Sequence, residues 1–85
     1  MCDTFVALSD VTADGQVIFG KNSDRPIFDC QPLRFTPRTT GQAGRPIQLE
    51  HVTLPQVEVA YATLGSGPYW CWGYEEGINE HRVVI

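Results

Sequence analysis

The sequence predicts a β-rich chain with no convincing helix, and three observations support that prediction. Short apolar runs rich in β-branched and aromatic residues recur along the 85 residues. Glycine, proline, asparagine and aspartate residues typical of turns separate these runs. No segment has the sustained three- and four-residue apolar spacing of an amphipathic helix. Hydrophobic residues make up 42 % of the chain, so material for a core is ample and disorder is not expected.

The first element expected is a β-hairpin over residues 3–20. Thr4–Leu8 is short, apolar and rich in strand formers, and Gln16–Gly20 has the character of a returning strand. Between them, Asp14 and Gly15 form a strong hairpin-turn signal. Because a hairpin returns the chain to its starting point, residues 21–24 are expected beside the N-terminus.

The remaining elements are shorter. Asn22–Pro26 has the composition of a turn. Further strands are expected at Leu33–Thr36, Ile47–Leu54, Val57–Leu64 and Val83–Ile85. Connecting loops are expected at Pro37–Pro46, Gly65–Pro68 and Glu75–Glu80. The last strand stops without a polar tail, which indicates a chain truncated from a longer domain.

Charge and cysteine content exclude several classes of protein. A net charge of −4 argues against a dedicated nucleic-acid binder and leaves no polybasic membrane patch. No segment approaches the roughly 18 consecutive apolar residues of a membrane span. The N-terminus lacks the basic and apolar regions of a signal peptide. Cys2, Cys30 and Cys71 are an odd number without C-x-x-C spacing, so a reducing cytoplasm is the expected location.

Cys2 has the most chemistry to offer. Met1 precedes this small residue, so its removal is plausible, and Cys2 would then carry both a thiol and a free α-amine. An α-amine has a reference pKa of about 7.7–8.0, so a fraction is neutral near pH 7–8 and can take the thiol proton. Nucleophile and base would then belong to one residue. The alternative is a cysteine without a chemical role.

The segment Ile18–Arg25 places a cation, an amide and a carboxylate at the end of a strand. In the expected hairpin, the Asp24 carboxylate could orient the α-amine, and the charge of Lys21 could favour the thiolate. The alternative is an Asx-turn closed by Asn22 or Asp24, with both basic side chains solvated.

Two motifs in this order, Met-Cys-Asp-Thr-Phe-Val-Ala-Leu at 1–8 and Ile-Phe-Gly-Lys-Asn-Ser-Asp-Arg at 18–25, resemble the start of the secernin group. That group belongs to peptidase family C69, the dipeptidases among the N-terminal-nucleophile (Ntn) hydrolases. Pro-Gln-Val-Glu at 55–58 and the stretch 70–81 are similar to later segments of the group. The resemblance extends over nearly the whole chain and is weakest at 38–45.

The resemblance implies a role for each of four residues. Cys2 matches the nucleophile, and Asp24 matches the acidic residue that contacts its amine. Lys21 stands where the more distant bile-salt and penicillin amidases have an arginine. Asn79 matches an asparagine of the oxyanion hole, where an N–H donor is often worth about 3–4 kcal/mol. The alternative for Asn79 is a turn residue before the last strand.

One departure from the family concerns Arg82, which stands where the family has a glycine after Asn-Glu-His. If that glycine takes a positive φ, Arg82 introduces strain on the order of 1 kcal/mol. Such strain would bear on Asn79 more than on the nucleophile. Relatives also continue well beyond this length, with helices and further site residues.

The resemblance implies an α+β fold in which residues 1–85 are the β-rich N-terminal portion of a single αββα sandwich. It implies a cysteine-type dipeptidase or amidohydrolase acting on small peptide or amide substrates, with the 85 residues alone inactive. The full-length protein could form homo-oligomers. The alternative is a non-catalytic secernin-like protein that acts in regulated secretion through partner binding.

No cofactor or metal is expected, because His51 and His81 lie thirty residues apart without ligand-spaced partners. The aromatic residues around Cys71 are expected in the core rather than in the wall of a substrate pocket. They are Tyr69, Trp70, Trp72 and Tyr74.

Overall fold

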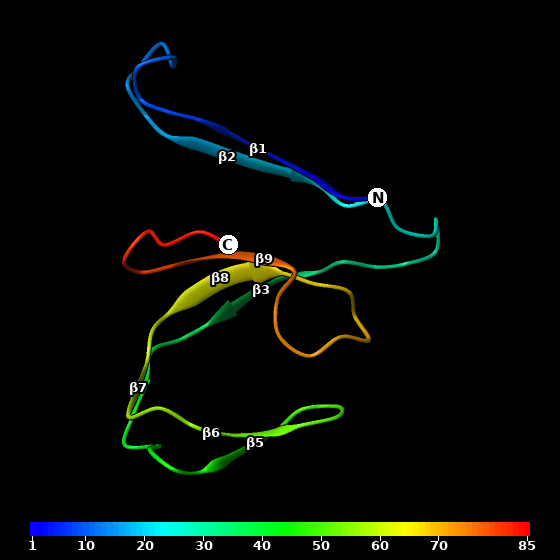
Figure 1. Ribbon diagram of the computed structural model, residues 1–85, viewed down its shortest axis with the longest axis vertical. Helices are drawn as coiled ribbons and strands as arrows, with labels where there is room; N and C mark the ends of the chain where they lie inside the picture. Colours follow the sequence, from blue (N-terminus) through cyan, green and yellow to red (C-terminus); the bar gives the residue numbers. More distant parts are fainter.

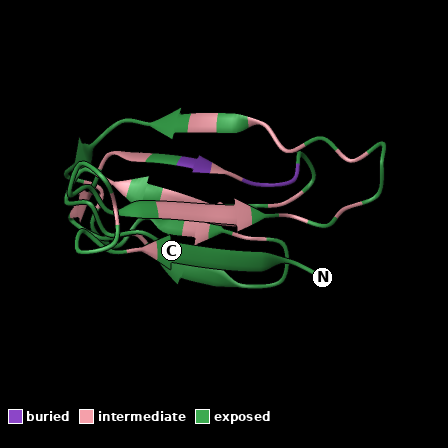
Figure 2. Ribbon diagram, turned by 90° about the horizontal axis from the view of Figure 1, so that it is seen from above, coloured by how far each residue is buried: buried purple, intermediate pink, exposed green.

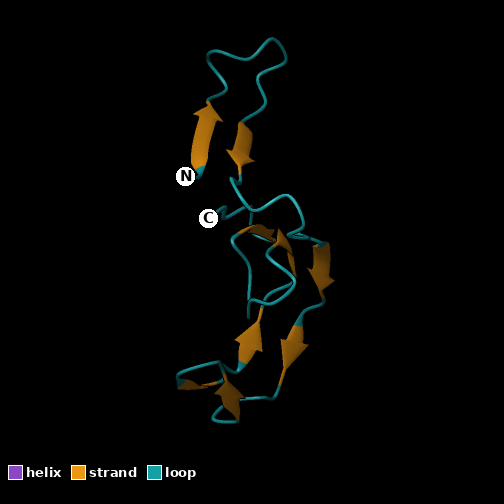
Figure 3. Cartoon of the chain, turned by 90° about the vertical axis from the view of Figure 1, so that its right-hand side faces the viewer, coloured by secondary structure: helices purple, strands orange, loops and turns teal.

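The computed structural model describes all 85 residues, and the chain forms nine short strands and no helix. These strands make four small antiparallel sheets, so the structure is all-β (Figures 1 and 3). The strands are β1 (Asp3–Ala7), β2 (Ile18–Asn22), β3 (Leu33–Thr36), β4 (Thr39–Thr40), β5 (Pro46–Gln48), β6 (Thr53–Pro55), β7 (Val59–Ala60), β8 (Thr63–Ser66) and β9 (Glu76–Asn79). No helix in it is long and apolar enough to cross a membrane.

The predicted N-terminal hairpin is confirmed. Strands β1 and β2 pair antiparallel, with Asp3 opposite Asn22 and Ala7 opposite Ile18. The second strand begins two residues later than predicted because Gln16 forms its hydrogen bonds within the loop. The Gln16 N–H donates to Asp14 Oδ1, and the Gln16 carbonyl accepts from Thr12 Oγ1. The pairing brings the end of β2 back to the N-terminus, as the sequence predicted.

The central sheet has the order β3-β8-β9, with β8 in the middle (Figure 1). The predicted strand Leu33–Thr36 is confirmed as β3. The predicted loop Glu75–Glu80 is wrong, because its residues 76–79 form β9 along the free edge of β8. On the other side of β9, Gly77 and Ile85 exchange two backbone hydrogen bonds of 3.0 Å. Strand pairing on both sides overrides a composition rich in glycine and glutamate.

The middle of the chain is divided more finely than predicted. The expected strand Ile47–Leu54 is wrong: the chain reverses between β5 and β6, and Leu49 N–H donates to the Val52 carbonyl at 2.8 Å. The expected strand Val57–Leu64 is two strands, β7 and the start of β8. The expected loop Pro37–Pro46 contains β4, which pairs with β7.

The structure has no apolar core. None of its fully buried residues is hydrophobic, and apart from Gly65 in β8 all strand residues are intermediate or exposed (Figure 2). The prediction that the aromatic cluster packs in a core is therefore wrong, since Trp70 is 53 % and Trp72 67 % exposed. Beyond hydrogen-bonded pairs, no two strands pack extensively on each other. The radius of gyration is 15.5 Å, compared with about 12 Å for a compact domain of this length.

Candidate functional site

Glu75, immediately before β9, lies at the centre of the densest set of polar contacts in the molecule. Its Oε1 accepts from Cys2 Sγ at 3.3 Å, and its Oε2 accepts from Arg25 Nη2 at 2.8 Å and from Gln31 Nε2 at 2.9 Å. Its side chain is only 13 % exposed. These contacts join the hairpin to the central sheet, because Cys2 and Arg25 flank the paired strands of the hairpin whereas Glu75 leads into β9.

Lys21 adds a second cation. Its Nζ lies 3.3 Å from Glu75 Oε1 and 3.4 Å from Glu76 Oε2, and it donates to the Glu75 carbonyl at 3.1 Å. Its side chain is 12 % exposed, so the ammonium is shielded from water on most sides. We refer to Cys2, Lys21, Arg25, Gln31, Glu75 and Glu76 as the Glu75 cluster. Two carboxylates offset two cations within it.

The electrostatics of the cluster favour an ionised Glu75. The pKa of Glu75 is lowered to about 2, chiefly by the hydrogen bond from Arg25. Desolvation acts in the opposite direction, and hydrogen bonds from Cys2 and Lys21 lower the pKa further. The same ion pair raises the pKa of Arg25 above its ordinary value. The carboxylate next to the Cys2 thiol therefore carries its negative charge throughout the physiological pH range.

Asp24 lies against the N-terminus. Its Oδ2 is 2.7 Å from the α-ammonium nitrogen of Met1, which donates to it. The hydrogen bond raises the pKa of the α-ammonium and lowers the pKa of Asp24. The paired register of β1 and β2 explains this contact, because Asp24 follows directly after the residues opposite the start of the chain.

Asn79 ends β9 and organises the turn that follows. Its Oδ1 accepts from the His81 N–H at 2.9 Å and from the Val83 N–H at 3.0 Å. These two bonds fix which way the amide faces, and the side-chain nitrogen is free of both. Arg82 in the same turn has φ 62°, so this residue adopts the left-handed backbone region.

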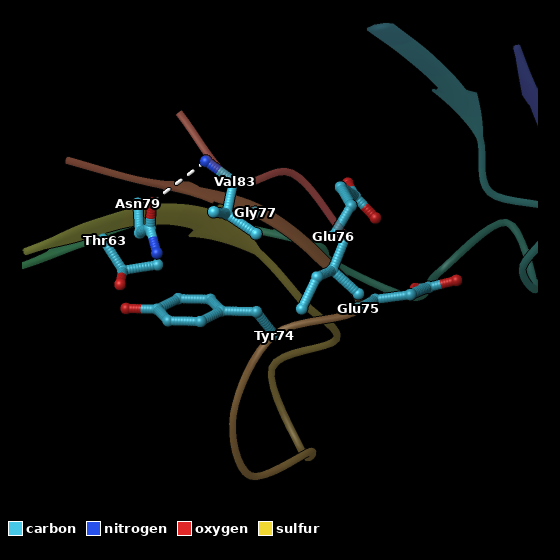
Figure 4. A pocket seen from close by; sticks show the side chains of 8 residues that line it. Thr63, Tyr74, Glu75, Glu76, Gly77, Asn79 and Val83 are labelled. Atoms are coloured by element: carbon cyan, nitrogen blue, oxygen red, sulfur yellow. Dashed lines mark hydrogen bonds between the residues drawn. The ribbon is translucent and has the colours of Figure 1, made fainter. Parts of the chain in front are cut away.

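A cavity of about 280 Å³ adjoins β9. Figure 4 shows Asn79 at one end of it and Glu75 at the other, with Tyr74 below and the Glu75 carboxylate directed away from Asn79. Asn79 is four residue steps of extended chain beyond Glu75, which corresponds to a distance of about 13 Å. The structure therefore brings Cys2, Lys21 and Asp24 to the open end of the hairpin, where it meets the central sheet. Asn79 lies at the other end of β9.

Sequence reasoning missed the Glu75 cluster as a unit. The sequence predicts a loop at Glu75 and assigns no chemical role to the Arg25 side chain. Their partners lie 44 to 73 residues away along the chain, so no local motif connects them. The one available signal is the coincidence of basic residues at and after the end of β2 and two adjacent glutamates at the start of β9.

No group of three or more histidine, cysteine, aspartate or glutamate side chains is arranged to hold a metal ion. All three cysteines are free thiols. No model of a known protein family matches the chain. No solved structure gives a significant match to it either.

Proposed function

We propose that this chain contributes the nucleophile and part of the active site of an Ntn-type cysteine amidohydrolase that cleaves small peptides or amides. The observation that carries the proposal is the 2.7 Å contact between Asp24 and the α-amine of the chain, one residue from the Cys2 thiol. A nucleophile of this class needs an oriented α-amine next to its thiol. Removal of Met1 would transfer the α-amine to Cys2 itself.

In the proposed reaction, the Cys2 α-amine takes the proton of its own thiol, and the sulfur attacks the carbonyl carbon of the substrate. The tetrahedral intermediate collapses, the C–N bond breaks, and the amine leaves with that proton. Water then attacks the thioester by the same route and regenerates the thiol. Asp24 orients the α-amine, and Lys21 contributes positive charge near the sulfur.

The proposed role of Asn79 is that of an oxyanion donor. Its amide orientation is fixed by two backbone donors, which supports a defined direction for its N–H groups. Because the Cys2 thiol contacts Glu75 at the start of β9 and Asn79 ends that strand, the two can act on one substrate only if the hairpin shifts along β9. We propose that this shift accompanies assembly of a complete αββα sandwich.

The lack of an apolar core supports an α+β sandwich as the complete fold. Strand faces with Phe5, Phe35 and Leu64 exposed are suited to being covered by helices. We propose that further residues supply those helices, that the complete protein is cytoplasmic, and that homo-oligomers can form. On this proposal, the 85 residues alone have no hydrolase activity.

Intact mass and one substitution test the proposed function. In the complete protein, we expect loss of Met1 by mass spectrometry and loss of dipeptide hydrolysis, to below about one thousandth of the original rate, in Cys2→Ala. Cys30→Ala is the matched control and should retain activity, because Cys30 is an exposed, free thiol that donates no hydrogen bond to Glu75. Retention of Met1, or full activity in Cys2→Ala, would contradict the proposal.

A second candidate is a non-catalytic protein that acts in regulated secretion through partner binding. The exposed apolar side chains favour it, because such surfaces are typical of interfaces. Thiol alkylation distinguishes the two functions. Faster alkylation of Cys2 than of Cys30 and Cys71 supports the hydrolase, and equal rates support the binding protein.

A further inference from the structure

We infer that Glu75 is the positioning residue for the Cys2 thiol, holding the sulfur through a hydrogen bond while it offsets the charges of Lys21 and Arg25. The inference rests on the proposed function, and it assigns Glu75 a part in the same site. The resemblance assigns no role in the site to Glu75. The residues to which it does assign roles are Cys2, Lys21, Asp24 and Asn79. Glu75 acts through Cys2 rather than on a substrate.

The geometry of Glu75 suits this role. One carboxylate oxygen receives both the thiol, at 3.3 Å, and the Lys21 ammonium, at 3.3 Å, while the other receives Arg25 and Gln31. Its backbone is fixed as well, since its N–H donates to the Ser66 carbonyl at 2.7 Å. A carboxylate held at so many points is rigid, and the thiol that donates to it acquires a defined position.

The charges around the thiol come from three parts of the chain. Lys21 and Arg25 lie at the end of the hairpin, Glu75 and Glu76 precede and begin β9, and the α-ammonium lies next to Asp24. Without Glu75, two cations would face the sulfur with much less compensation, and a thiolate would be favoured. Glu75 therefore balances the positive charges of Lys21 and Arg25 beside the sulfur that it holds.

A purely structural role predicts something different. Glu75 also connects the hairpin to the central sheet. If that were its only role, removing its charge while keeping its shape would not change the pH dependence of Cys2 alkylation. The decisive measurement is therefore the pH dependence of Cys2 alkylation, which reports the thiolate fraction. Iodoacetamide labelling with peptide mass spectrometry separates Cys2 from the other two cysteines.

Two substitutions should move this pH profile in opposite directions. Glu75→Gln keeps an oxygen acceptor but removes the negative charge, so half-maximal alkylation should move down by about one pH unit or more. Arg25→Gln removes a positive charge and should move it up by roughly one unit. Glu80→Gln is the matched control, because it removes a carboxylate that pairs with Arg38 at 3.0 Å, outside the cluster. It should leave the profile unchanged.

Opposite shifts can arise only from charge acting on a folded site. If both substitutions unfolded the site, Cys2 would take the same exposed-thiol profile in each variant, which would overturn the inference. Unchanged profiles would overturn it too. Because the readout needs no hydrolysis, opposite shifts without any amidase activity would reject the proposed function and leave the positioning role standing. Hydrolysis that depends on Cys2, together with unshifted alkylation profiles, would reject the positioning role of Glu75 and leave the proposed function standing.

Discussion

At the scale of single residues, Glu75 is where the molecule concentrates its interactions. It receives a thiol, an ammonium, a guanidinium and an amide, and no other side chain has so many partners. Ion pairs on open surfaces contribute little, but these lie where side chains are mostly shielded from water. The contacts of this one residue therefore determine how the hairpin meets the central sheet.

The first prediction concerns the pH dependence of these contacts. The folded-state pKa of Glu75, about 2, lies below its ordinary value of 4.5. Its ion pairs therefore stabilise the folded arrangement fully above about pH 4.5, and this contribution is lost as the pH falls through 2. In the complete protein, NMR titration of the Glu75 side-chain carboxyl carbon should give a midpoint near 2.

Arg25→Gln supplies the control for this titration. Removal of the largest cause of the shift should raise the Glu75 midpoint toward 4.5. A midpoint near 4.5 in the unaltered protein would contradict the ion pairs themselves.

The second prediction concerns Arg82, whose φ of 62° is costly for a side chain with a Cβ. Arg82→Gly should stabilise the turn after β9 by up to about 1 kcal/mol, since relief of strain exceeds the added entropy of the unfolded chain. Hydrogen exchange of the Val83 N–H, which donates to Asn79 Oδ1, should slow by up to about fivefold.

Gly44→Ala is the matched control for Arg82→Gly. Gly44 has φ 74° and open space around it, so a Cβ there introduces backbone strain without a steric clash. Its own turn should lose about 1 kcal/mol, while exchange at Val83 stays the same. Faster exchange of the Val83 N–H in Arg82→Gly would contradict the prediction that backbone strain at residue 82 destabilises this turn.

At the scale of elements, the central sheet depends on a close approach at β8. A Cβ on Gly65 would lie 2.7 Å from the Tyr74 ring and 2.8 Å from the Glu76 carbonyl oxygen. Backbone on one side and an aromatic ring on the other leave no room for it. The absence of a side chain at this position is what allows β9 and the preceding loop to lie against β8.

The third prediction follows from that contact. Gly65→Ala should separate β9 from β8 and destabilise the sheet by about 1–3 kcal/mol, measured as faster hydrogen exchange of the Glu75 and Glu80 amides, which donate to the Ser66 and Ala62 carbonyls. Gly20→Ala provides the comparison. Its Cβ would meet only the Phe5 ring, which is exposed and free to turn away, so β1 and β2 should stay paired. Equal loss of structure in both variants would contradict the argument.

At the scale of the whole molecule, the chain is extended and has no hydrophobic interior. The four sheets are spread along a longest dimension of 44 Å, with the hairpin at one end and β5–β6 at the other (Figure 1). Local hydrogen bonds hold each group together, but little apolar surface is removed from water between them. Cooperative folding needs such burial, because it offsets the loss of chain entropy.

The fourth prediction follows from this architecture. The isolated 85 residues should be poorly soluble and should unfold without a sharp transition, since exposed apolar faces and open strand edges promote association. Calorimetry combined with light scattering tests this prediction. A monomeric sample with a sharp, cooperative thermal transition would contradict it.

How much could be predicted from the sequence depended on how local the cause was. The turn residues between the first two strands predicted the hairpin and the return of residues 21–24 to the N-terminus, both of which the structure has. Arg82 has a positive φ, which is the condition under which strain was expected at this residue. The reversal inside 47–54 was missed, because an apolar run hides a short turn.

The sequence by itself determined the strand-rich character of the chain, the first hairpin and the neighbourhood of Cys2 and Asp24, because turn chemistry acts between residues close together in the chain. Only the tertiary structure decided that Glu75 contacts the thiol, that β9 is a strand and that the aromatic side chains stay exposed. Those features depend on partners many residues away or on surfaces brought together in space. No local pattern of residue types encodes such contacts.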